Sequence, residues 1–269
     1  MEFVFKYIQT FVDYYSKFLI FTIPFFVVLY ILFKEYFKPV KIQQKELSKK
    51  DLQREVFYSI ASISVISLVV YLTLFGPLTP YTKIYFDFNE YPVWYYIICF
   101  PVMMIIHETY YYWIHRFMHL PKIFDWVHKV HHKSTNPSPW SAYSFSPIEA
   151  IFEIGILPIL AFLMPLHISA LSVYLVIQIS FAVYGHSGFD FAPKGFYKHW
   201  LGKWLNTSLH HNLHHDSRSL ENYGKGYSYG FYFTIWDRIM GTMDPDYDEL
   251  FSELEERRAQ KKKKKKEKK

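Results

Sequence analysis

His115-Arg116-Phe117-Met118-His119 and, after a short spacer, His128-Lys129-Val130-His131-His132 are two histidine motifs at the end of a long aromatic and aliphatic run. A third motif, His210-His211-Asn212-Leu213-His214-His215, follows much later in the chain. Together the three motifs hold nine of the 13 histidines, a clustering that random placement would rarely produce. This clustering indicates an all-histidine metal site.

The spacing of these histidines suits helices that present several imidazoles on one face. Residues four apart on an α-helix are neighbours, so His115 and His119 can hold one ion. Imidazole suits Fe, Zn, Cu or Ni, and the available imidazoles exceed the needs of a single ion. The sequence therefore predicts two metal ions. The candidate ligands are His115, His119, His128, His131, His132, His186, His211, His214 and His215.

Other polar residues near the motifs are candidates for supporting contacts. No Asp or Glu lies within the motifs, so the predicted ligands are all nitrogen atoms, unlike the carboxylate-rich sites of some helix bundles. Glu108 and Glu149 either orient ligating imidazoles or are ordinary buried carboxylates. His199 and His210 could also make such orienting contacts.

Apolar residues are concentrated in runs that are long enough to cross a membrane. Hydrophobic residues make up 51% of the chain and aromatic residues 21%. A hydrocarbon core ~30 Å thick needs about 20 apolar residues in a helix. The runs occupy residues 18–33, 56–75, 93–113, 148–166 and 168–184, after an amphipathic lead-in at residues 1–17 without a cleavable signal peptide. The predicted fold class is all-α, a multi-pass membrane protein with about 4–5 membrane helices and a cytoplasmic histidine-rich cap.

Basic residues indicate the orientation of the chain in the membrane. The loop of residues 34–54 carries seven Lys and Arg residues, which predicts that it is cytoplasmic. Counting crossings from this loop places the histidine motifs and the C-terminus on the same side. Residues 261–269 contribute +7 to the net charge of +6, so the rest of the chain is near −1. We predict a disordered tail here, or one that contacts anionic lipid headgroups, and no nucleic-acid binding.

The chain is expected to form one helical membrane domain. Its single cysteine, Cys99, excludes an internal disulfide and any Cys-rich zinc or iron–sulfur site. Residues 1–89 are predicted to be N-terminal membrane helices, residues 90–243 the catalytic domain, and residues 244–269 a charged, disordered C-terminal tail.

The three motifs resemble the histidine boxes of the fatty acid hydroxylase/sterol desaturase superfamily, and most closely its sterol C-5 desaturase-like branch. The resemblance covers about residues 90–243. The supporting segments are Tyr112-Trp113-Ile114-His115-Arg116, Ser146-Pro147-Ile148-Glu149-Ala150, Gly185-His186-Ser187-Gly188, Asn222-Tyr223-Gly224 and Trp236-Asp237-Arg238 with Gly241-Thr242. Two positions depart from the family pattern. Ser146 stands where many relatives carry His, and the extra His210 makes the register of the third box ambiguous, although His211 fits the spacing.

This resemblance implies a non-haem di-iron enzyme that uses O2 and two electrons. The electrons would come ultimately from NAD(P)H through a separate carrier of the cytochrome b5 or ferredoxin type. The reaction would desaturate or hydroxylate a C–H position of a lipid from the bilayer, with a sterol or a fatty acyl chain as the expected substrate. The expected location is the bacterial inner membrane, or the endoplasmic reticulum membrane in a eukaryote.

Two functions of other classes remain open on the residues alone. These are a histidine-rich metal transporter or sensor and a zinc-stabilised membrane scaffold. A transporter would place its ligands near the bilayer midplane, in facing or broken helices. The histidines here lie at helix ends and in polar segments, which favours the enzyme.

Overall fold

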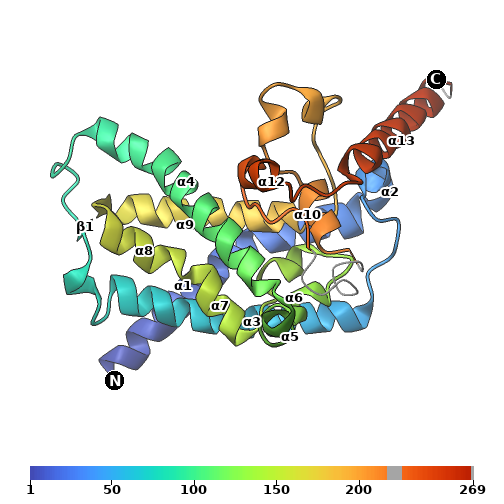
Figure 1. Cartoon of the computed structure of the whole chain (residues 1–269). Coiled ribbons are helices and arrows are strands. Elements are labelled where there is room, and N and C mark those ends of the chain that lie inside the picture. The colour runs from blue at the N-terminus through green and yellow to red at the C-terminus, as the bar shows by residue number, and fades with distance from the viewer. Residues whose placement is uncertain (217–225, 268–269) are drawn as a thin grey trace.

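Helices make up most of the regular structure in the computed structural model, which describes residues 1–216 and 226–267 except for the side chains of residues 262 and 264–266. Four helices in this part of the chain are long and apolar enough to cross a membrane. They are α1 (Glu2–Phe26) with its π-helical extension η1 (Val27–Leu32), α3 (Lys49–Leu74), α4 (Val93–Met118) and α9 (Ile168–Gly185). The protein is thus an all-α, multi-pass membrane protein, as the sequence predicted (Figure 1).

Shorter elements connect and follow the four long helices. Before α4 lie α2 (Lys34–Phe37), η2 (Lys38–Val40), η3 (Thr79–Tyr81) and β1 (Ile84–Tyr85). Between α4 and α9 lie α5 (Pro121–Val127), α6 (Lys129–His132), η4 (Pro139–Tyr143), α7 (Pro147–Ile154), α8 (Ile156–Leu163) and β2 (Leu166–His167). After α9 lie η5 (Phe196–Lys198), η6 (Gly202–Trp204), α10 (Ser208–His214), α12 (Ile235–Met240) and α13 (Tyr247–Glu267).

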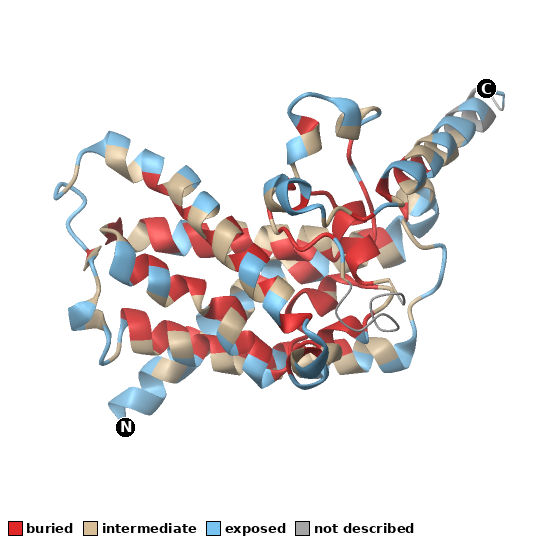
Figure 2. Ribbon diagram, viewed as in Figure 1, coloured by how far each residue is buried: buried red, intermediate tan, exposed pale blue. Residues whose placement is uncertain are grey.

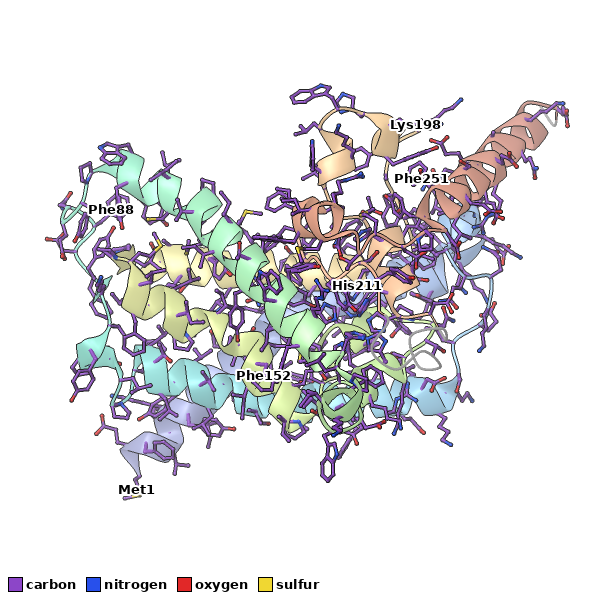
Figure 3. All side chains as sticks on the ribbon, viewed as in Figure 1. Met1, Phe88, Phe152, Lys198, His211 and Phe251 are labelled. Carbon is purple, nitrogen blue, oxygen red and sulfur yellow. The ribbon has the colours of Figure 1, made fainter. Side chains whose placement is uncertain are left out.

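The chain passes repeatedly between two ends of the helix bundle. Helix α7 packs against α3, and α8 packs against α3 and α4; together they return the chain to the end at which α4 begins (Figure 1). There β1 and β2 pair in parallel, with Ile84 opposite Leu166. The histidine motifs lie toward the other end of α4, and Figure 3 shows His211 far from Phe88.

The apolar core sits where α1, α3, α9 and η4 meet. Phe18, Ile63 and Leu171 are fully buried there. The outward faces of the long helices are also apolar, and Ile20 and Ile105 are 65% and 61% exposed. These faces appear as the pale outer surface of the bundle in Figure 2. An apolar outer surface of this kind is expected where helices face lipid, and is rare on soluble proteins.

Side chains fix the start of three helices by accepting N–H groups of the first turn. Ser48 Oγ accepts from the Asp51 N–H at 3.3 Å at the start of α3. Ser146 Oγ accepts from the Glu149 N–H at 3.1 Å at the start of α7. His167 Nδ1 does the same for Ser169 at the start of α9. Such caps satisfy donors that have no partner within the helix.

Two segments predicted from hydropathy have different boundaries in the structure. Residues 1–17 are not a separate lead-in, because α1 runs unbroken from Glu2 and its charged residues pair one turn apart, as Lys6 does with Glu2 at 2.9 Å. The run 148–166 is not one helix, because α7 and α8 meet at Gly155. A Cβ at Gly155 would clash with the Tyr110 hydroxyl, which donates to the Phe152 carbonyl.

The prediction of a disordered tail over residues 244–269 is wrong for Tyr247–Glu267, which form α13. Tyr247, Phe251 and Leu254 are buried and form a second, smaller core with Leu209 and Leu213 of α10. Their spacing of four and then three residues puts the three side chains on one helix face. This apolar face anchors the helix, and the Lys-rich run continues from it. Contact of that run with lipid headgroups stays a prediction.

Candidate metal centre

The nine histidines predicted as ligands converge into two groups at one end of the bundle, where Figure 3 labels His211. Within each group the candidate ligand atoms all lie within 4.8 Å of one another. All nine side chains are buried. The first group consists of His115, His119, His128, His132 and His214, and the second of His131, His186, His211 and His215. The structure therefore brings together all nine histidines that the sequence predicted as ligands and divides them into two sites.

Four segments deliver these side chains. The last turn of α4 ends in the first histidine motif, α6 carries the second, and α10 with its C-cap residue carries the third. His186 is the residue that follows α9. Because the segments are far apart in the sequence, the site exists only once the bundle has formed.

In the first group, facing imidazole nitrogens stand at the separation expected for ligands of one ion. The Nε2 atoms of His115 and His128 are 3.0 Å apart. His214 Nε2 lies 3.2 Å from His119 Nε2 and 3.0 Å from His132 Nε2. Imidazole nitrogens lie about 2.1 Å from zinc, so neighbouring ligands at about 90–110° stand roughly 3.0–3.4 Å apart. The first group therefore has the dimensions of a metal site.

The second group has the same dimensions. His186 Nε2 lies 3.2 Å from His131 Nε2 and 2.9 Å from His211 Nε2. His215 Nε2 lies 3.2 Å from His211 Nε2. Each group offers at least four nitrogen ligands, and among the described residues neither group includes a carboxylate or a cysteine. This donor set fits the all-nitrogen site expected from the sequence.

Hydrogen bonds fix which nitrogen of each facing ring carries the proton. His115 Nδ1 lies 3.0 Å from the Tyr229 carbonyl, and His128 Nδ1 lies 2.6 Å from Glu149 Oε1. A carbonyl oxygen accepts, and so does Glu149 in its ionised form; each Nδ1 then donates and each Nε2 keeps a bare lone pair. The Nε2 lone pairs of His115 and His128 therefore face each other at 3.0 Å. That contact is repulsive unless a cation lies between the two nitrogens.

The same arrangement recurs in both groups. His214 Nδ1 donates to the Tyr227 carbonyl at 2.7 Å, and His186 Nδ1 donates to the Ala182 carbonyl at 2.8 Å. Metal-binding histidines commonly donate their second ring N–H to a carbonyl or carboxylate, which fixes the tautomer and the ring orientation. These four rings are thus held ready for a metal.

Burial keeps the imidazoles neutral. It lowers the pKa of His186 and of His214 to about 4, so both rings are uncharged at pH 7 and their lone pairs are free. Burial is also the main cause that lowers the pKa of the following residues well below the ordinary value: His119, His128, His131, His132, His211 and His215. Protons therefore compete weakly with a metal for these nitrogens.

Two buried carboxylates hold the loop that carries the accepting carbonyls. Asp237 accepts from the N–H groups of Tyr229 and Gly230, each at 2.9 Å. Glu108 accepts from the N–H groups of residues 231–233, the shortest contact being 2.7 Å. These bonds fix the backbone of the loop, and so they fix the carbonyl that orients His115.

Ser146 supports the contact between Glu149 and His128. Its hydroxyl donates to the Val127 carbonyl at 2.7 Å and accepts from the Glu149 N–H. One side chain thus ties the start of α7 to the residue before His128. Ser146 therefore acts as the N-terminal cap of α7.

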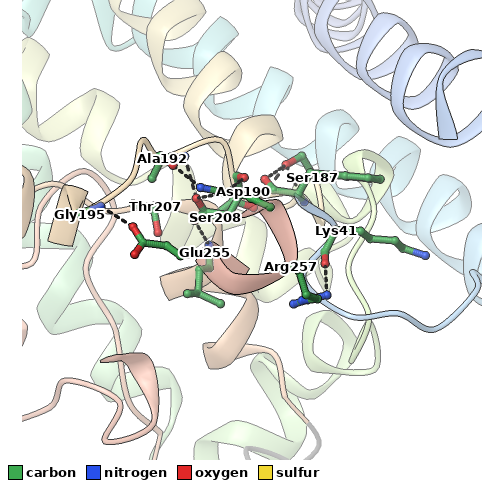
Figure 4. Close-up of polar contacts among 12 residues, drawn as sticks. Lys41, Ser187, Asp190, Ala192, Gly195, Thr207, Ser208, Glu255 and Arg257 are labelled. Atoms are coloured by element: carbon green, nitrogen blue, oxygen red, sulfur yellow. Dashed lines mark hydrogen bonds and ion pairs between the residues drawn. The ribbon is translucent and has the colours of Figure 1, made fainter. Parts of the chain in front are cut away.

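A hydrogen-bonded network connects α10 to the C-terminal helix (Figure 4). Asp190 accepts from the Leu209 N–H at 3.0 Å in the first turn of α10 and from the Ala192 N–H at 2.8 Å. Arg258 of α13 donates to the Asp190 carbonyl and to the Ala192 carbonyl. The network fixes the start of the helix that carries the third histidine motif.

The other predicted contacts differ in outcome. Glu149 reaches an imidazole, whereas Glu108 bonds backbone N–H groups instead. His199 is exposed, outside both histidine groups. His210 is buried, but its Nε2 lies 3.5 Å from Met243 Sδ rather than on a ligand. Glu108, His199 and His210 therefore do not orient an imidazole, because their side chains point elsewhere. The segment Asn222-Tyr223-Gly224, which supported the family resemblance, lies outside the described residues.

Sequence reasoning missed Asp237 and the three carbonyls of Tyr227, Tyr229 and Ala182. Asp237 lies in the motif Trp236-Asp237-Arg238, so its presence was visible but its role was not. A backbone carbonyl leaves no mark in a sequence, because every residue has one. These contacts appear only with the fold.

Residues 100–242, more than half of the chain, match the Fatty acid hydroxylase family. The chain belongs to this family, as the histidine boxes predicted.

Curated relatives include several sterol-modifying enzymes. The chain is 28% identical over 204 residues to the lathosterol oxidase of Rattus norvegicus, which covers 75% of this chain and 64% of that protein. It is 30% identical over 105 residues to a Delta(7)-sterol 5(6)-desaturase of Gibberella zeae, covering 39% of this chain and 32% of the relative. It is 26% identical over 161 residues to the C-4 methylsterol oxidase of Candida albicans, covering 58% and 52%.

The matched region thus spans less than two thirds of the length of these relatives. The chain matches no solved structure.

Proposed function

We propose that this chain is a membrane-bound non-haem di-iron oxidoreductase that uses O2 to desaturate or hydroxylate a C–H position of a lipid. The observation that carries the proposal is the pair of lone pairs on His115 and His128, which face each other at 3.0 Å in a buried site. The second histidine group supplies a matching site beside it. Two all-nitrogen sites and membership of the Fatty acid hydroxylase family agree with this chemistry.

The protein's own residues would bind the metal ions, orient the imidazole rings and shield the centre from water. The nine histidines would hold the two ions, and the carbonyls and Glu149 fix the ring tautomers. Burial of all nine rings excludes bulk water from the reacting centre. A bound iron pair would supply redox chemistry with O2 that no side chain can perform.

The reaction balances with one O2, two electrons and two protons. Hydroxylation inserts one oxygen atom into the C–H bond and reduces the other to water. Desaturation removes two hydrogens from the lipid and yields two waters. The electrons would come ultimately from NAD(P)H through a separate carrier of the cytochrome b5 or ferredoxin type.

The names of the relatives support a sterol or a fatty acyl chain as the substrate. The rat and Candida albicans proteins are named as oxidases of lathosterol and of a C-4 methylsterol, and the family is named for fatty acid hydroxylation. Both substrate classes are lipids, which the exposed apolar faces of the bundle would meet in the membrane.

The basic loop supports a cytoplasmic position for the histidine sites. Arg54 donates to the Lys133 carbonyl at 3.0 Å, and Gln43 Nε2 lies 3.0 Å from Asn212 Oδ1. The loop of residues 34–54 therefore lies against the segments that carry the second and third motifs. By the positive-inside rule, this end of the bundle faces the cytoplasm.

Two alternative functions are less well supported. A transporter would hold its metal near the bilayer midplane, but both groups lie at one end of the bundle. A zinc-stabilised scaffold accounts for the histidines but not for relatives named as oxidases and desaturases, since Zn²⁺ has no redox chemistry.

Metal analysis of protein purified without oxygen tests the proposal. We expect two irons per chain, and loss of about one iron from His128→Ala and from His131→Ala, because each changes one of the two groups. His199→Ala is the matched control, since this exposed histidine lies outside both groups and its replacement should leave both irons in place.

An activity assay completes this test. Lathosterol, incubated with the protein, O2 and a reductase chain, should lose two hydrogens or gain one oxygen by mass spectrometry. A fatty acyl substrate is assayed in parallel. One ion or none per chain, or zinc in place of iron, would contradict the di-iron centre.

A further inference from the structure

A small cavity lies inside the bundle next to the second histidine group. Its volume is about 20 Å³, which is room for one water-sized group. Its wall includes Tyr14, Ile66, Tyr111, Glu153, Gln178 and His186. Any group bound in this cavity would therefore sit beside His186, one of the candidate metal ligands.

Two buried oxygen atoms on the wall of this cavity have no hydrogen-bond partner. They are Oε1 of Glu153 on α7 and Oε1 of Gln178 on α9. The two residues are only 7% and 5% exposed. A buried acceptor without a donor is unfavourable, and in native proteins such an acceptor usually marks a missing water or ligand.

Two tyrosines on this wall pair with each other. The Tyr14 and Tyr143 hydroxyls lie 3.1 Å apart and hydrogen-bond to each other. The Tyr143 carbonyl accepts from the Ser62 hydroxyl. Neither tyrosine hydroxyl bonds to Glu153 or Gln178, so among the described residues both oxygens are open to a donor that enters the cavity.

A larger groove lies on the far side of Tyr14, between α1, α3 and α9. Its volume is about 370 Å³, within the range of pockets that hold small organic ligands. Tyr14 lines both the groove and the small cavity, so the two spaces are neighbours. The groove has an apolar wall with a polar rim at the end distant from the histidines, which includes Val70, Leu74, Leu175, Lys6, Asp13 and Lys17.

One face of α9 connects the groove to the metal centre. The residues that line the two spaces recur every three or four positions, which puts them on one side of the helix. They are Ile168, Ser172, Leu175, Gln178, Ala182 and, after the helix, His186. At 1.5 Å per residue this stripe is roughly 27 Å long, the length of an extended lipid.

We propose that the cavity at Glu153 and Gln178 binds the hydroxyl group of a lipid whose apolar body lies in the groove between α1, α3 and α9. The hydroxyl donates its proton to one of the two unpaired oxygens, which a ketone or an ether cannot do. The hydroxyl then lies beside His186, because the cavity has room for one water-sized group. That this lipid is the substrate rests on the proposed function, whereas the binding itself does not.

Equilibrium binding to detergent-solubilised, metal-loaded protein tests this subsite. The probes are radiolabelled lathosterol against its 3-keto analogue, and 1-octadecanol against its methyl ether. We expect at least one alcohol to bind about tenfold more tightly than its partner, which corresponds to ~1.4 kcal/mol.

Variants separate the subsite from general packing. Glu153→Met and Gln178→Met keep the side-chain length but remove the accepting oxygen, and the variant at the residue that accepts the hydroxyl should bring the affinity ratio close to one. Glu153→Gln keeps an amide oxygen and should retain the preference for the alcohol. Metal content, measured for every variant, should stay at the wild-type value.

Three outcomes would overturn the subsite. The first is an affinity ratio of alcohol to ketone or ether that stays unchanged in both Met variants. The second is loss of the preference for the alcohol in Glu153→Gln. The third is no preference for either alcohol in the wild-type protein. The third result would mean that the cavity holds an ordered water only. It is measured on the wild-type protein, so it does not depend on whether a variant folds. If lathosterol is turned over but no preference for the alcohol is seen, the subsite is wrong and the oxidase function stands. If the preference is seen but no lipid is turned over, the oxidase function is wrong and the subsite stands.

Discussion

At the scale of the residue, the centre depends on which nitrogen of each imidazole is protonated. His115 and His128 can both offer Nε2 to one ion only because Nδ1 of each ring donates elsewhere. For His115 the acceptor is a backbone carbonyl, which no substitution removes. For His128 the acceptor is the Glu149 side chain. Glu149 is therefore the point at which the tautomers of the first group can be altered by mutation.

Glu149→Leu should remove metal from the first group and leave the second group loaded. Without an acceptor, no hydrogen bond stabilises the Nδ1–H tautomer of His128. The proton can then move to Nε2, where it blocks metal binding. Loss of such a supporting contact typically weakens metal binding about 10–100-fold. The measurement is an anaerobic iron titration, in which we expect one tight site and one weak site instead of two tight sites.

Glu149→Gln is the matched control for this prediction. The amide oxygen can still accept from His128 Nδ1, so most of the affinity of the first site should return. Equal loss in the Gln and Leu variants would show that packing at this position, rather than the hydrogen bond to His128, holds the first group together. Two tight sites in Glu149→Leu would refute the role of Glu149.

At the scale of the element, the long helices were predictable and the breaks between them were not. The third apolar run and its histidine motif correspond to α4, which begins at Val93 as expected. Hydropathy merged α7 with α8, because it carries no sign of Gly155, where the two helices meet and Tyr110 of another helix approaches closely. It also gave no sign of the pairing of β1 with β2, which joins residues 84–85 to residues 166–167.

Helix α13 shows how a charge average can hide a structural signal. The Lys-rich run dominated the prediction of a disordered tail, yet Tyr247, Phe251 and Leu254 mark a helix face just before it. The same element carries Arg258, which reaches two backbone carbonyls beside the start of α10. The C-terminal helix therefore braces the element that holds the third histidine motif.

Arg258→Ala should lower the melting temperature of the metal-loaded protein and release metal from the second group first. Hydrogen bonds from a charged donor contribute about 1.5–3 kcal/mol each. Each kcal/mol lost lowers Tm by about 2–4 °C in a domain of this size, so loss of one such bond should lower Tm by about 3–12 °C. Thermal unfolding in detergent and iron content after mild chelation measure the two effects.

Lys261→Ala provides the control for Arg258→Ala on the same helix. Lys261 Nζ donates to the carbonyls of Glu35 and Tyr36 and does not reach the α10 network. Its replacement should leave the second iron in place. If both variants release metal equally, the effect comes from loosening of α13 as a whole rather than from the bonds of Arg258.

At the scale of the whole molecule, convergence of the histidines was predictable, but their division between the two sites was not. Hydropathy and the basic loop placed every motif at one end of the bundle, and the structure has them there. His131 and His132 are adjacent in sequence yet belong to different groups. Adjacent residues on α6 point in different directions, so the grouping depends on where α4, α9 and α10 meet that helix.

Orientation in the membrane is the last property that the whole fold predicts. Lys45 is exposed in the basic loop, where its carbonyl accepts from Asn136 of the segment that follows the second histidine motif, and Asn89 is exposed in the loop before α4. In a Cys99→Ser background, the Lys45→Cys variant should resist a membrane-impermeant maleimide until the cells are lysed. The Asn89→Cys variant should react in intact cells. The reverse pattern would put the metal centre on the far side of the membrane, out of reach of a cytoplasmic electron carrier.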